Sequence, residues 1–325
     1  MKISVLGAGA WGTALAKLLV ESGHEATLWG RNAAHLEELA ARRENARLLP
    51  GISLPSKLTF DADLAHAAQA EILIVSLPSN ALDAIAVRLP HYRGIVVSTT
   101  KGIELESGLT MSGVISRRLP YARVVALSGP SIALEVAKHI PTAVVAASED
   151  PATARVVQEL FNTPAFRVYS SADLAGVELG GALKNVFAIA AGVCDGLGFG
   201  DNTKAALITR AIAEMRRIGV AGGAQADTFA GLSGLGDLTV TCFSPHSRNR
   251  AFGEKLGRGG KPVAILSEMV SVVEGFPTAR SARQLARKLG VVTPIIDEVH
   301  AMLYESKHPK EAVRDLMTRD LKAED

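Results

Sequence analysis

The feature that most constrains the fold is a glycine-rich hexapeptide, GAGAWG at residues 7–12. It directly follows a short β-branched run at 3–6 and opens an amphipathic helical pattern at 13–21. In this context Gly7 allows a tight turn, Gly9 lets the backbone approach a pyrophosphate, and Gly12 lets the helix pack on the strand. The N-terminus of the helix then faces the negative charge. We therefore predict a dinucleotide-binding turn and consider a strand–helix turn without a ligand the less favoured alternative.

The first half of the chain alternates short strand patterns with helical patterns. The predicted strands cover residues 3–6, 26–29, 72–75, 95–97, 124–127 and 143–147, and the predicted helices cover 13–21, 33–43, 81–88 and 111–118. Short, mostly β-branched runs are typical of strands buried on both faces of a parallel sheet. The β-α-β-α order predicts an α/β fold with a doubly wound Rossmann sheet.

The pattern changes near Ser171. Beyond it, long stretches rich in Ala, Leu and Gly indicate helices, with hardly another strand signal. We expect Ser171 or Asp173 to cap the first of these helices. The prediction is a Rossmann domain at residues 1–171 and an all-helical domain at 172–325, and a length of 325 residues suits two domains. The helical domain offers a surface for a homodimer, although no stripe in it requires one.

Charge and cysteine content exclude several classes of protein. Lys and Arg total 35 and Asp and Glu total 33, a net charge of +2, which provides no field for nucleic acid or an anionic membrane. Cys194 and Cys242 have no metal-site spacing, so we expect no metal and a reducing compartment. The longest nearly apolar stretch, 186–194, is less than half of a bilayer span, and no secretory signal opens the sequence. These observations predict a cytoplasmic protein.

The end of the second predicted strand bears on the choice of cofactor. A site dedicated to NAD usually has Asp or Glu there, about 20 residues past the glycines, bound to the ribose 2′-hydroxyl. This chain has Arg31 instead. Because a guanidinium pairs with a 2′-phosphate and stacks on adenine, we expect NADP to be accepted as well as NAD. A solvated surface arginine is the alternative, so the preference stays open.

Three polar loops each follow a predicted strand, at residues 76–78, 99–102 and 128–131. In open α/β sheets, ligands bind beyond the carboxyl ends of the strands, so these loops belong near the nicotinamide. Lys101 places a cation at one such end. The commoner alternative for a single lysine is an ordinary surface position.

Lys184 interrupts an otherwise apolar helix of small residues. Gly180 and Gly181 lie one turn before it, and because glycine costs helix propensity, we expect another element to pack closely there. Desolvation lowers the pKa of a buried lysine toward neutrality, which suits a general acid or base at pH 7. A lysine that reaches solvent from the helix edge is an equally weighted alternative.

Two polar segments follow. Asp237 lies between flexible and apolar residues in GLGDLT, 234–239, and residues 247–250, SRNR, offer a hydroxyl, two guanidiniums and an amide. Such donors together suit a phosphate, whose oxygens accept several charge-assisted hydrogen bonds. Taken alone, the second segment is more simply an exposed polar turn.

Together these segments resemble the bacterial type of NAD(P)-dependent glycerol-3-phosphate dehydrogenase, over essentially the whole chain and in the same order. The most specific match is GALKN at 181–185 with DGLGFGDN at 195–202. The glycine turn, TKG at 100–102, SGPS at 128–131, Gly236-Asp237 and SRN at 247–249 agree with the family in sequence. One departure is Ala10, where many members have Ser; a backbone N–H serves equally there.

The resemblance implies a site and a reaction. Lys184 would be the catalytic proton donor or acceptor, aided by Asp237 and Lys101. The implied contacts of glycerol 3-phosphate are Lys101, Gly129, Ser131, Lys184, Asp237, Ser247, Arg248 and Asn249. The implied cofactor positions are Gly7, Gly9, Ala10, Trp11, Gly12, Arg31, Lys101, Ala133, Arg248, Val273 and Glu274. The implied reaction is the reversible reduction of dihydroxyacetone phosphate to sn-glycerol 3-phosphate, which feeds phospholipid synthesis.

The expected mechanism places the substrate between the domains, with its phosphate on Arg248 and Asn249. Hydride passes from NAD(P)H to the carbonyl carbon while the Lys184 ammonium protonates the developing alkoxide. One alternative is a related reductase acting on a hydroxy acid or a ketopantoate-like substrate, which carries a carboxylate in place of the phosphate. Another is a nucleotide-sensing protein without turnover, which has no need of Lys184 or of the donors at 247–250.

Overall fold

The computed structural model describes residues 1–269, 272–321 and 323–324. The chain forms two compact units. Unit 1 comprises Met1–Glu104 and Leu109–Glu178, and unit 2 comprises Leu105–Gly108 and the residues from Leu179 onward. The unit boundary thus lies a few residues after the predicted position 171, inside the first turns of a long helix, and unit 2 also takes up a short loop from the middle of unit 1.

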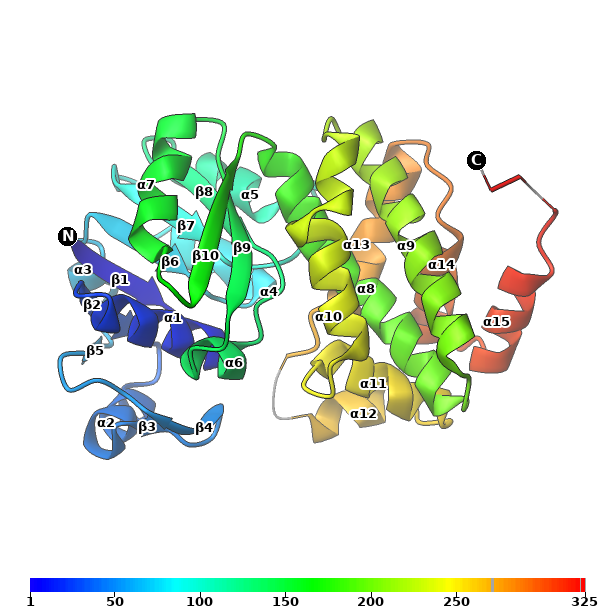
Figure 1. Cartoon of the computed structure of the whole chain (residues 1–325), viewed down its shortest axis with the longest axis horizontal. Helices are drawn as coiled ribbons and strands as arrows, with labels where there is room; N and C mark the ends of the chain where they lie inside the picture. The colour runs from blue at the N-terminus through cyan, green and yellow to red at the C-terminus, as the bar shows by residue number, and fades with distance from the viewer. Residues whose placement is uncertain (270–271, 322, 325) are drawn as a thin grey trace. The chain divides into compact units, whose positions relative to one another are not determined.

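Unit 1 is built on an eight-stranded sheet of order β10-β9-β8-β7-β6-β1-β2-β5 (Figure 1). The strands are β1 (Lys2–Leu6), β2 (Glu25–Trp29), β5 (Thr59–Asp61), β6 (Ile72–Val75), β7 (Ile95–Ser98), β8 (Arg123–Ser128), β9 (Thr142–Ala147) and β10 (Phe166–Ser171). Along the part of the sheet with order β8-β7-β6-β1-β2-β5, every neighbouring pair of strands is parallel. A separate antiparallel pair joins β3 (Glu44–Asn45) and β4 (Leu49–Ser53). The predicted Rossmann sheet is confirmed.

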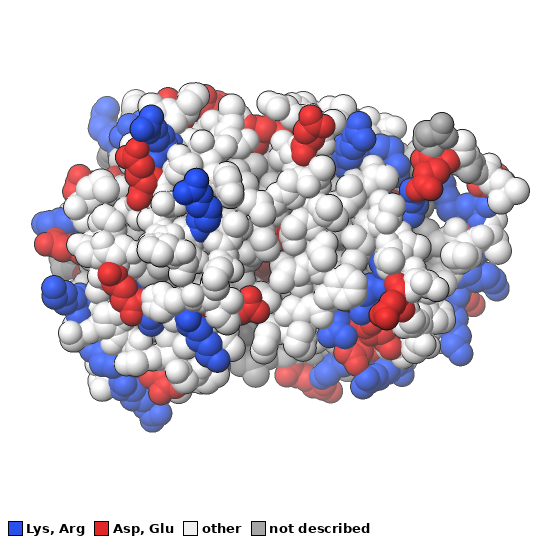
Figure 2. Space-filling model, viewed as in Figure 1, with Lys and Arg blue, Asp and Glu red and all other residues white. Residues whose placement is uncertain are grey.

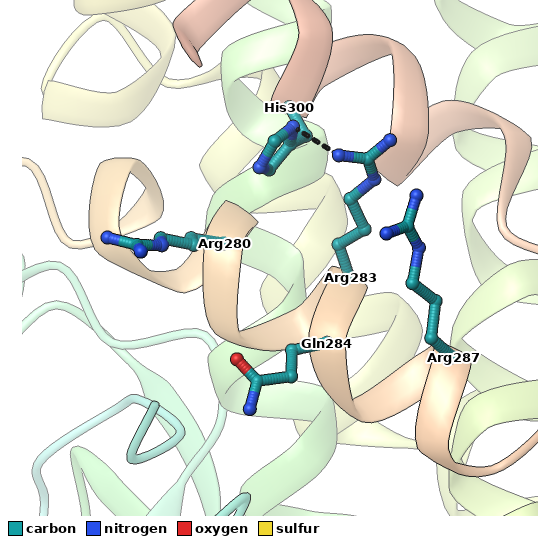
Figure 3. A pocket seen from close by; sticks show the side chains of 5 residues that line it. All are labelled: Arg280, Arg283, Gln284, Arg287 and His300. Carbon is teal, nitrogen blue, oxygen red and sulfur yellow. Dashed lines mark hydrogen bonds between the residues drawn. The ribbon is translucent and has the colours of Figure 1, made fainter. Parts of the chain in front are cut away.

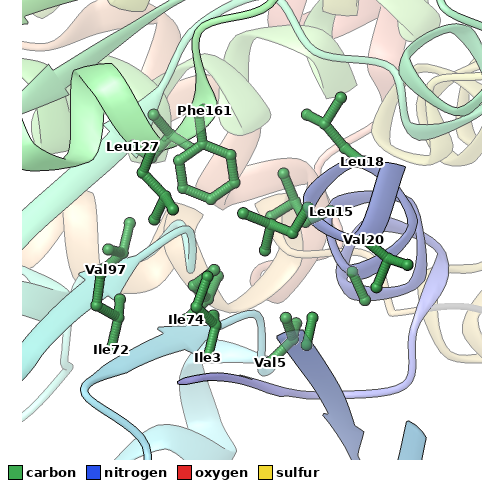
Figure 4. Close-up of a cluster of buried hydrophobic side chains, with 14 of the residues drawn as sticks. Ile3, Val5, Leu15, Leu18, Val20, Ile72, Ile74, Val97, Leu127 and Phe161 are labelled. Atoms are coloured by element: carbon green, nitrogen blue, oxygen red, sulfur yellow. The ribbon is translucent and has the colours of Figure 1, made fainter. Parts of the chain in front are cut away.

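Helices cover both faces of this sheet. They are α1 (Ala10–Glu21), α2 (Ala33–Arg42), α3 (Leu64–Ala67), α4 (Ser79–Ala86), α5 (Met111–Arg118), α6 (Ala133–Ala137) and α7 (Pro151–Phe161). On one face α1 and α7 pack on the sheet through residues such as Leu15 and Phe161 (Figure 4). On the other face α3, α4 and α5 pack through residues such as Leu82 and Ile115. Both cores hold the strand ends, where the predicted ligand loops begin, in fixed register.

The direction of the sixth predicted strand was wrong. β9 pairs antiparallel with β8, and β10 runs parallel to β9. The sequence pattern missed β10 and also β5 at the other edge of the sheet. The connection from β8 to β9 contains only α6, a helix of five residues. Such a helix is about 8 Å long, and the rest of the connection, 129–132 and 138–141, is not helical, so no crossover helix runs the length of a strand of about 20 Å. The chain therefore turns at the same edge of the sheet and returns in the opposite direction.

Unit 2 is helical in its described residues, as predicted. Its elements are α8 (Leu174–Gly196, which begins in unit 1), α9 (Asp201–Ala221), η1 (Ala226–Ala230), η2 (Leu232–Gly236), α10 (Asp237–Phe243), α11 (Arg248–Gly257), α12 (Pro262–Glu268), α13 (Gly275–Lys288), α14 (Pro294–Tyr304) and α15 (Pro309–Met317). Asp173 caps α8, because its carboxylate accepts from the Gly176 N–H at 2.9 Å. Of the two caps that the sequence offered, Asp173 is therefore the one used.

Helix α8 is the core of unit 2. By length and composition it is the one described helix that could span a membrane, and its most apolar window is entirely buried within the protein.

A buried carboxylate joins α9 to α14 in this unit. Glu214 accepts hydrogen bonds from the N–H groups of Ile295 and Ile296 at 3.1 and 2.9 Å. It thereby satisfies two buried backbone N–H groups at the start of α14, which have no partner within the helix. Burial raises the pKa of Glu214 to about 7.

Charged side chains of both signs are interspersed on the face of the molecule drawn in Figure 2, and no extended patch of one sign interrupts them. This matches the near balance of acidic and basic residues in the sequence. An anionic ligand must therefore be held by local groups.

Candidate active site

The glycine turn joins β1 to α1, as predicted. Gly7 has φ of +124°, a left-handed value that a side chain rarely adopts, and its N–H donates to the Trp29 carbonyl at 2.9 Å. A Cβ on Gly7 would lie 2.3 Å from the Ser76 carbonyl oxygen, and one on Gly12 would lie 1.9 Å from the Gly7 carbonyl oxygen. These two glycines are therefore required by the protein's own packing.

Gly9 differs from both of them. It is the N-cap of α1 in extended conformation, with φ of −78° and ψ of 178°, and a Cβ built on it meets no protein atom within 4 Å. The first turn of α1, which contains the half-buried Ala10 and Trp11, has no acidic residue. Open space beside the backbone N–H groups of a helix start fits a pyrophosphate. The turn thus has the chemistry that a dinucleotide needs.

Arg31 lies two residues beyond the end of β2 and is exposed. Its neighbour Asn32 caps α2, since the Asn32 side chain accepts from the His35 N–H at 3.1 Å. The cap fixes the backbone next to Arg31 while its guanidinium stays accessible. This geometry is compatible with both interpretations of Arg31, a 2′-phosphate contact and a solvated side chain.

The loop after β7 is tied to the end of β6. The Thr99 hydroxyl donates to the Val75 carbonyl at 3.1 Å, and the Thr100 hydroxyl donates to the Leu77 carbonyl at 2.8 Å. Lys101 follows directly and is half-buried. Because β6 and β7 are parallel neighbours, the loop lies at the same sheet edge as the glycine turn, where the sequence predicted it.

The loop after β8 lies at that same edge. Gly129 has φ of +142°, and the Ser131 hydroxyl donates to the Gly129 carbonyl at 3.0 Å. Ala133 is the first residue of the short helix α6. Unit 1 therefore gathers the glycine turn, Lys101 and the loop of Gly129 and Ser131 at the carboxyl ends of adjacent strands.

Lys184 lies inside unit 2, on α8, with only 7% of its surface exposed. Its ammonium forms an ion pair with Asp237 and donates to the Thr241 hydroxyl at 2.8 Å. The Thr241 hydroxyl in turn donates to the Asp237 carbonyl at 2.6 Å. The interpretation of Lys184 as a lysine that reaches solvent from the helix edge is wrong, because the side chain is buried and paired.

Gly180, one of the two glycines predicted to mark close packing near Lys184, does so. A Cβ on Gly180 would lie 2.5 Å from the Ser233 carbonyl oxygen. Ser233 belongs to η2, a single π-helical turn that leads directly into α10, whose first residue is Asp237. Insertions of π type are frequent at functional sites because they shift the residues that follow. The close approach of η2 to α8 thus places Asp237 beside Lys184.

Asp237 is 1% exposed and supplies the negative charge that a buried ammonium requires. Thr241, which sequence reasoning missed, lies four residues after Asp237 on the same helix. An i, i+4 spacing places both side chains on one face, so the spacing itself was the available signal. The three groups form a fixed cluster around one amine that can donate and accept a proton.

Helices α8 and α11 approach each other through glycines. A Cβ on Gly192 would lie 1.9 Å from the Arg250 carbonyl oxygen, and one on Gly253 would lie 2.0 Å from the Ile189 carbonyl oxygen. Backbones in such contact place the start of α11 directly against α8. The donors at 247–250 are thereby brought to the same helix as Lys184.

Asn249 is buried and takes part in a chain of amides. Its Nδ2 donates to Asn185 Oδ1 at 2.9 Å, and its Oδ1 accepts from the Gly275 N–H at 2.9 Å. Asn185 Nδ2 then donates to Glu274 Oε2 at 3.3 Å. The predicted phosphate residue Asn249 and the predicted cofactor residue Glu274 are thus joined through Asn185, next to Lys184 in sequence. Val273, the other cofactor prediction here, is buried.

The four donors at 247–250 do not act alike. The Ser247 side chain caps α11 by accepting from the Arg250 N–H at 3.2 Å, while Arg248 is exposed. The Arg250 guanidinium is paired with Asp195 at 2.6 Å, and Lys204 pairs with the same carboxylate at 2.5 Å. The expectation of two guanidiniums for a phosphate is therefore corrected to one, Arg248, because Arg250 is engaged in this ion-pair network.

The two cysteines have no chemical role that the structure supports. Both thiols are free and buried, and burial raises the pKa of Cys194 to about 11 and of Cys242 to about 12. Such thiols are not nucleophilic at neutral pH. No cluster of His, Cys, Asp or Glu suited to a metal occurs among the residues that the structure describes.

A Rossmann sheet with its glycine turn and a helical unit with a buried, acid-paired lysine define a dinucleotide-dependent oxidoreductase. Residues 2–154 match the model of the NAD-dependent glycerol-3-phosphate dehydrogenase N-terminus, and residues 173–314 match that of the C-terminus. The chain belongs to the NAD-dependent glycerol-3-phosphate dehydrogenase family.

Individual relatives agree with this assignment. The chain is 52% identical to a glycerol-3-phosphate dehydrogenase (NAD(P)+) of Geobacter sulfurreducens, with 99% of this chain and 98% of the relative covered. A solved glycerol-3-phosphate dehydrogenase of Coxiella burnetii is 36% identical and superposes with a TM-score of 0.94, covering 98% of this chain and 99% of the other. A solved yeast glycerol-3-phosphate dehydrogenase is 26% identical, with a TM-score of 0.83 and coverage of 98% and 99%.

Proposed function

We propose that this protein catalyses the reversible NAD(P)H-dependent reduction of dihydroxyacetone phosphate to sn-glycerol 3-phosphate. The observation that carries the proposal is the buried Lys184 ammonium, paired with Asp237 and hydrogen-bonded to Thr241, in a member of this family. A buried charged pair gains little stability over apolar packing, so its presence here favours a chemical role.

Lys184 donates the proton to the ketone oxygen as negative charge develops on it, and in the reverse direction it accepts that proton. Asp237 and the Thr241 hydroxyl hold the amine in one orientation, which removes the cost of aligning it during the reaction. Lys101 adds positive charge near the developing alkoxide. The bound nicotinamide dinucleotide supplies the hydride for the carbonyl carbon.

The substrate phosphate is held at the start of α11. Arg248 is exposed there, and the N-terminus of a ten-residue helix attracts an anion. Ser247 and Asn249 contribute a hydroxyl and the second amide hydrogen, since the first is donated to Asn185. Gly129 and Ser131 complete the substrate contacts in this proposal.

The cofactor pyrophosphate is held by the turn of Gly7, Gly9 and Gly12, with Arg31 at the adenosine ribose. Ala133, Val273 and Glu274 are further proposed cofactor contacts. Arg31 supports the use of NADP as well as NAD. The product is the backbone precursor for phospholipid synthesis. We place the enzyme in the cytoplasm, where it acts on a small phosphorylated substrate and needs neither nucleic acid nor insertion into a membrane. A homodimer is compatible with this proposal.

The test is a rate measurement with NADPH and a panel of ketones, followed as loss of reduced cofactor. We expect turnover of dihydroxyacetone phosphate and little turnover of dihydroxyacetone or of 2-oxo acids. Arg248→Ala should raise KM for the phosphorylated ketone about tenfold to a hundredfold, because a charge-assisted hydrogen bond contributes about 1.5–3 kcal/mol. Arg258, an exposed arginine at the other end of α11, provides the matched control. Equal rates with the unphosphorylated ketone would refute the proposed substrate.

A further inference from the structure

A cavity of about 230 Å³ opens on unit 2 beside α13 and α14 (Figure 3). Its lining consists of polar side chains that can donate hydrogen bonds, Arg280, Arg283, Gln284, Arg287 and His300. None of them belongs to the Lys184 cluster, to the start of α11 or to the glycine turn. The cavity is therefore separate in its residues from the proposed active site.

The sequence of α13 creates this lining. Residues three, four and seven positions apart lie on one face of a helix. On α13 these positions hold Arg280, then Arg283 and Gln284, then Arg287. The opposite face of the helix is apolar or small and buried. This spacing puts three arginines on one side of α13. In Figure 3, Arg283 and Arg287 lie side by side and Arg280 points away from both.

Arg283 is held in place by its surroundings. Its Nε lies 3.0 Å from Asp297 Oδ1, its Nη1 lies 2.8 Å from Glu305 Oε1, and the same Nη1 lies 2.9 Å from His300 Nδ1. Burial and the neighbouring Arg283 charge lower the pKa of His300, which makes the ring neutral at pH 7. One wall of the cavity is therefore fixed before any ligand arrives.

Arg280 and Arg287 are exposed, and neither has an acidic partner among the residues that the structure describes. The helix dipole accounts for Arg287, which lies in the last turn of α13, where a cation is favourable. It does not account for Arg280, which lies in the first half of the helix. Two guanidiniums whose positive charge has no acidic partner among the described residues thus line a polar cavity. Such a cavity favours binding of an anion.

We propose that this cavity binds a small phosphorylated anion through the exposed guanidiniums of Arg280 and Arg287. The planar guanidinium matches phosphate oxygens in a bidentate manner, and Gln284 adds an amide donor. The cavity volume is several times the volume of about 30 Å³ that one water molecule occupies in the liquid. The site therefore has room for a phosphoryl group and a few further atoms. The proposal does not depend on the reaction assigned to Lys184.

Inorganic phosphate is the probe, titrated calorimetrically into the full chain at constant ionic strength. The titration uses Arg248→Ala as background, which weakens the proposed substrate phosphate contact. We compare this background with the same protein also carrying Arg280→Gln and Arg287→Gln, and with one carrying Lys288→Gln. Lys288 is an exposed cation on the same helix that does not line the cavity, so it is the matched control.

We expect phosphate to bind the background with a Kd of about 1 mM, the affinity that a few charge-assisted contacts support. The double substitution should weaken binding about tenfold or more, and Lys288→Gln should change it by no more than about twofold. No binding to the background at about 10 mM phosphate would overturn the proposal. Equal weakening by Lys288→Gln, or binding unchanged by the double substitution, would overturn it as well, since the cavity would then not be the site.

Discussion

Replacing Gly9 by Ala separates the ligand-binding role of the glycine turn from its structural role. The φ and ψ values of Gly9, −78° and 178°, are accessible to alanine, and the new Cβ meets no protein atom within 4 Å. Lower flexibility of the unfolded chain stabilises such a variant by about 0.4–1 kcal/mol, while alanine is a slightly poorer N-cap than glycine. These effects oppose each other, so we expect Tm to change by less than about 4 °C.

Cofactor binding should respond quite differently. The added methyl group occupies the open space beside the first N–H groups of α1, where the pyrophosphate is predicted to lie. Losing one charge-assisted hydrogen bond to a phosphate oxygen costs about 1.5–3 kcal/mol. The Kd for NADPH should therefore rise about tenfold to a hundredfold, because each 1.4 kcal/mol corresponds to a factor of ten.

The measurement is a titration of NADPH binding by fluorescence, paired with thermal unfolding. Gly12→Ala is the contrasting variant, because its Cβ would lie 1.9 Å from the Gly7 carbonyl oxygen and force the backbone to move. We expect it to lose stability, by about 1–3 kcal/mol or more. Unchanged NADPH affinity in a stably folded Gly9→Ala protein would refute the argument.

Three further outcomes test other parts of the structure. Gly192→Ala should separate α8 from α11, because its Cβ would overlap the Arg250 carbonyl oxygen. The displaced start of α11 should raise KM for dihydroxyacetone phosphate, and an unchanged KM would contradict the proposed phosphate site. Thr241→Val should lower kcat by about tenfold with little change in KM, since it removes a contact that orients Lys184; a change in KM alone would contradict that role. The raised pKa of Glu214, about 7 against the ordinary 4.5, means that the folded chain binds this proton more tightly than the unfolded chain. The free energy of unfolding should therefore fall by up to about 3 kcal/mol as pH rises from 4.5 through 7, and urea unfolding of Glu214→Gln should lack this fall.

Most of the sheet could be predicted from the sequence because each buried strand is a short β-branched run next to a helical pattern. The predicted strands β1, β2, β6, β7 and β8 are parallel and mostly buried, so the pattern and its cause coincide. β5, Thr59–Asp61, was not predicted, because it has only three residues and none of them is buried. β10 escaped notice because Arg167 and Tyr169 alternate with its buried Phe166 and Val168. The reversal at β9 depends on how short α6 is, which composition alone does not reveal.

The site was predictable where a single residue breaks its surroundings. Lys184 stands out in an apolar helix, and Asp237 stands out between glycines and apolar residues. The engagement of Arg250 with Asp195, and of Asn249 with Asn185, was not predictable, because both depend on the glycine contacts between α8 and α11. A sequence shows which donors exist, whereas packing decides which of them remain available to a ligand.

The most direct test of the account is the turnover of Lys184 variants at saturating dihydroxyacetone phosphate and NADPH. Lys184→Ala removes the proposed acid, and Lys184→Arg keeps a positive charge for Asp237 but does not release a proton near neutral pH. We predict that kcat falls about a hundredfold or more in both, with NADPH affinity changed by no more than about twofold. A kcat near that of the unmodified enzyme in either variant would contradict the assignment of Lys184 as the proton donor.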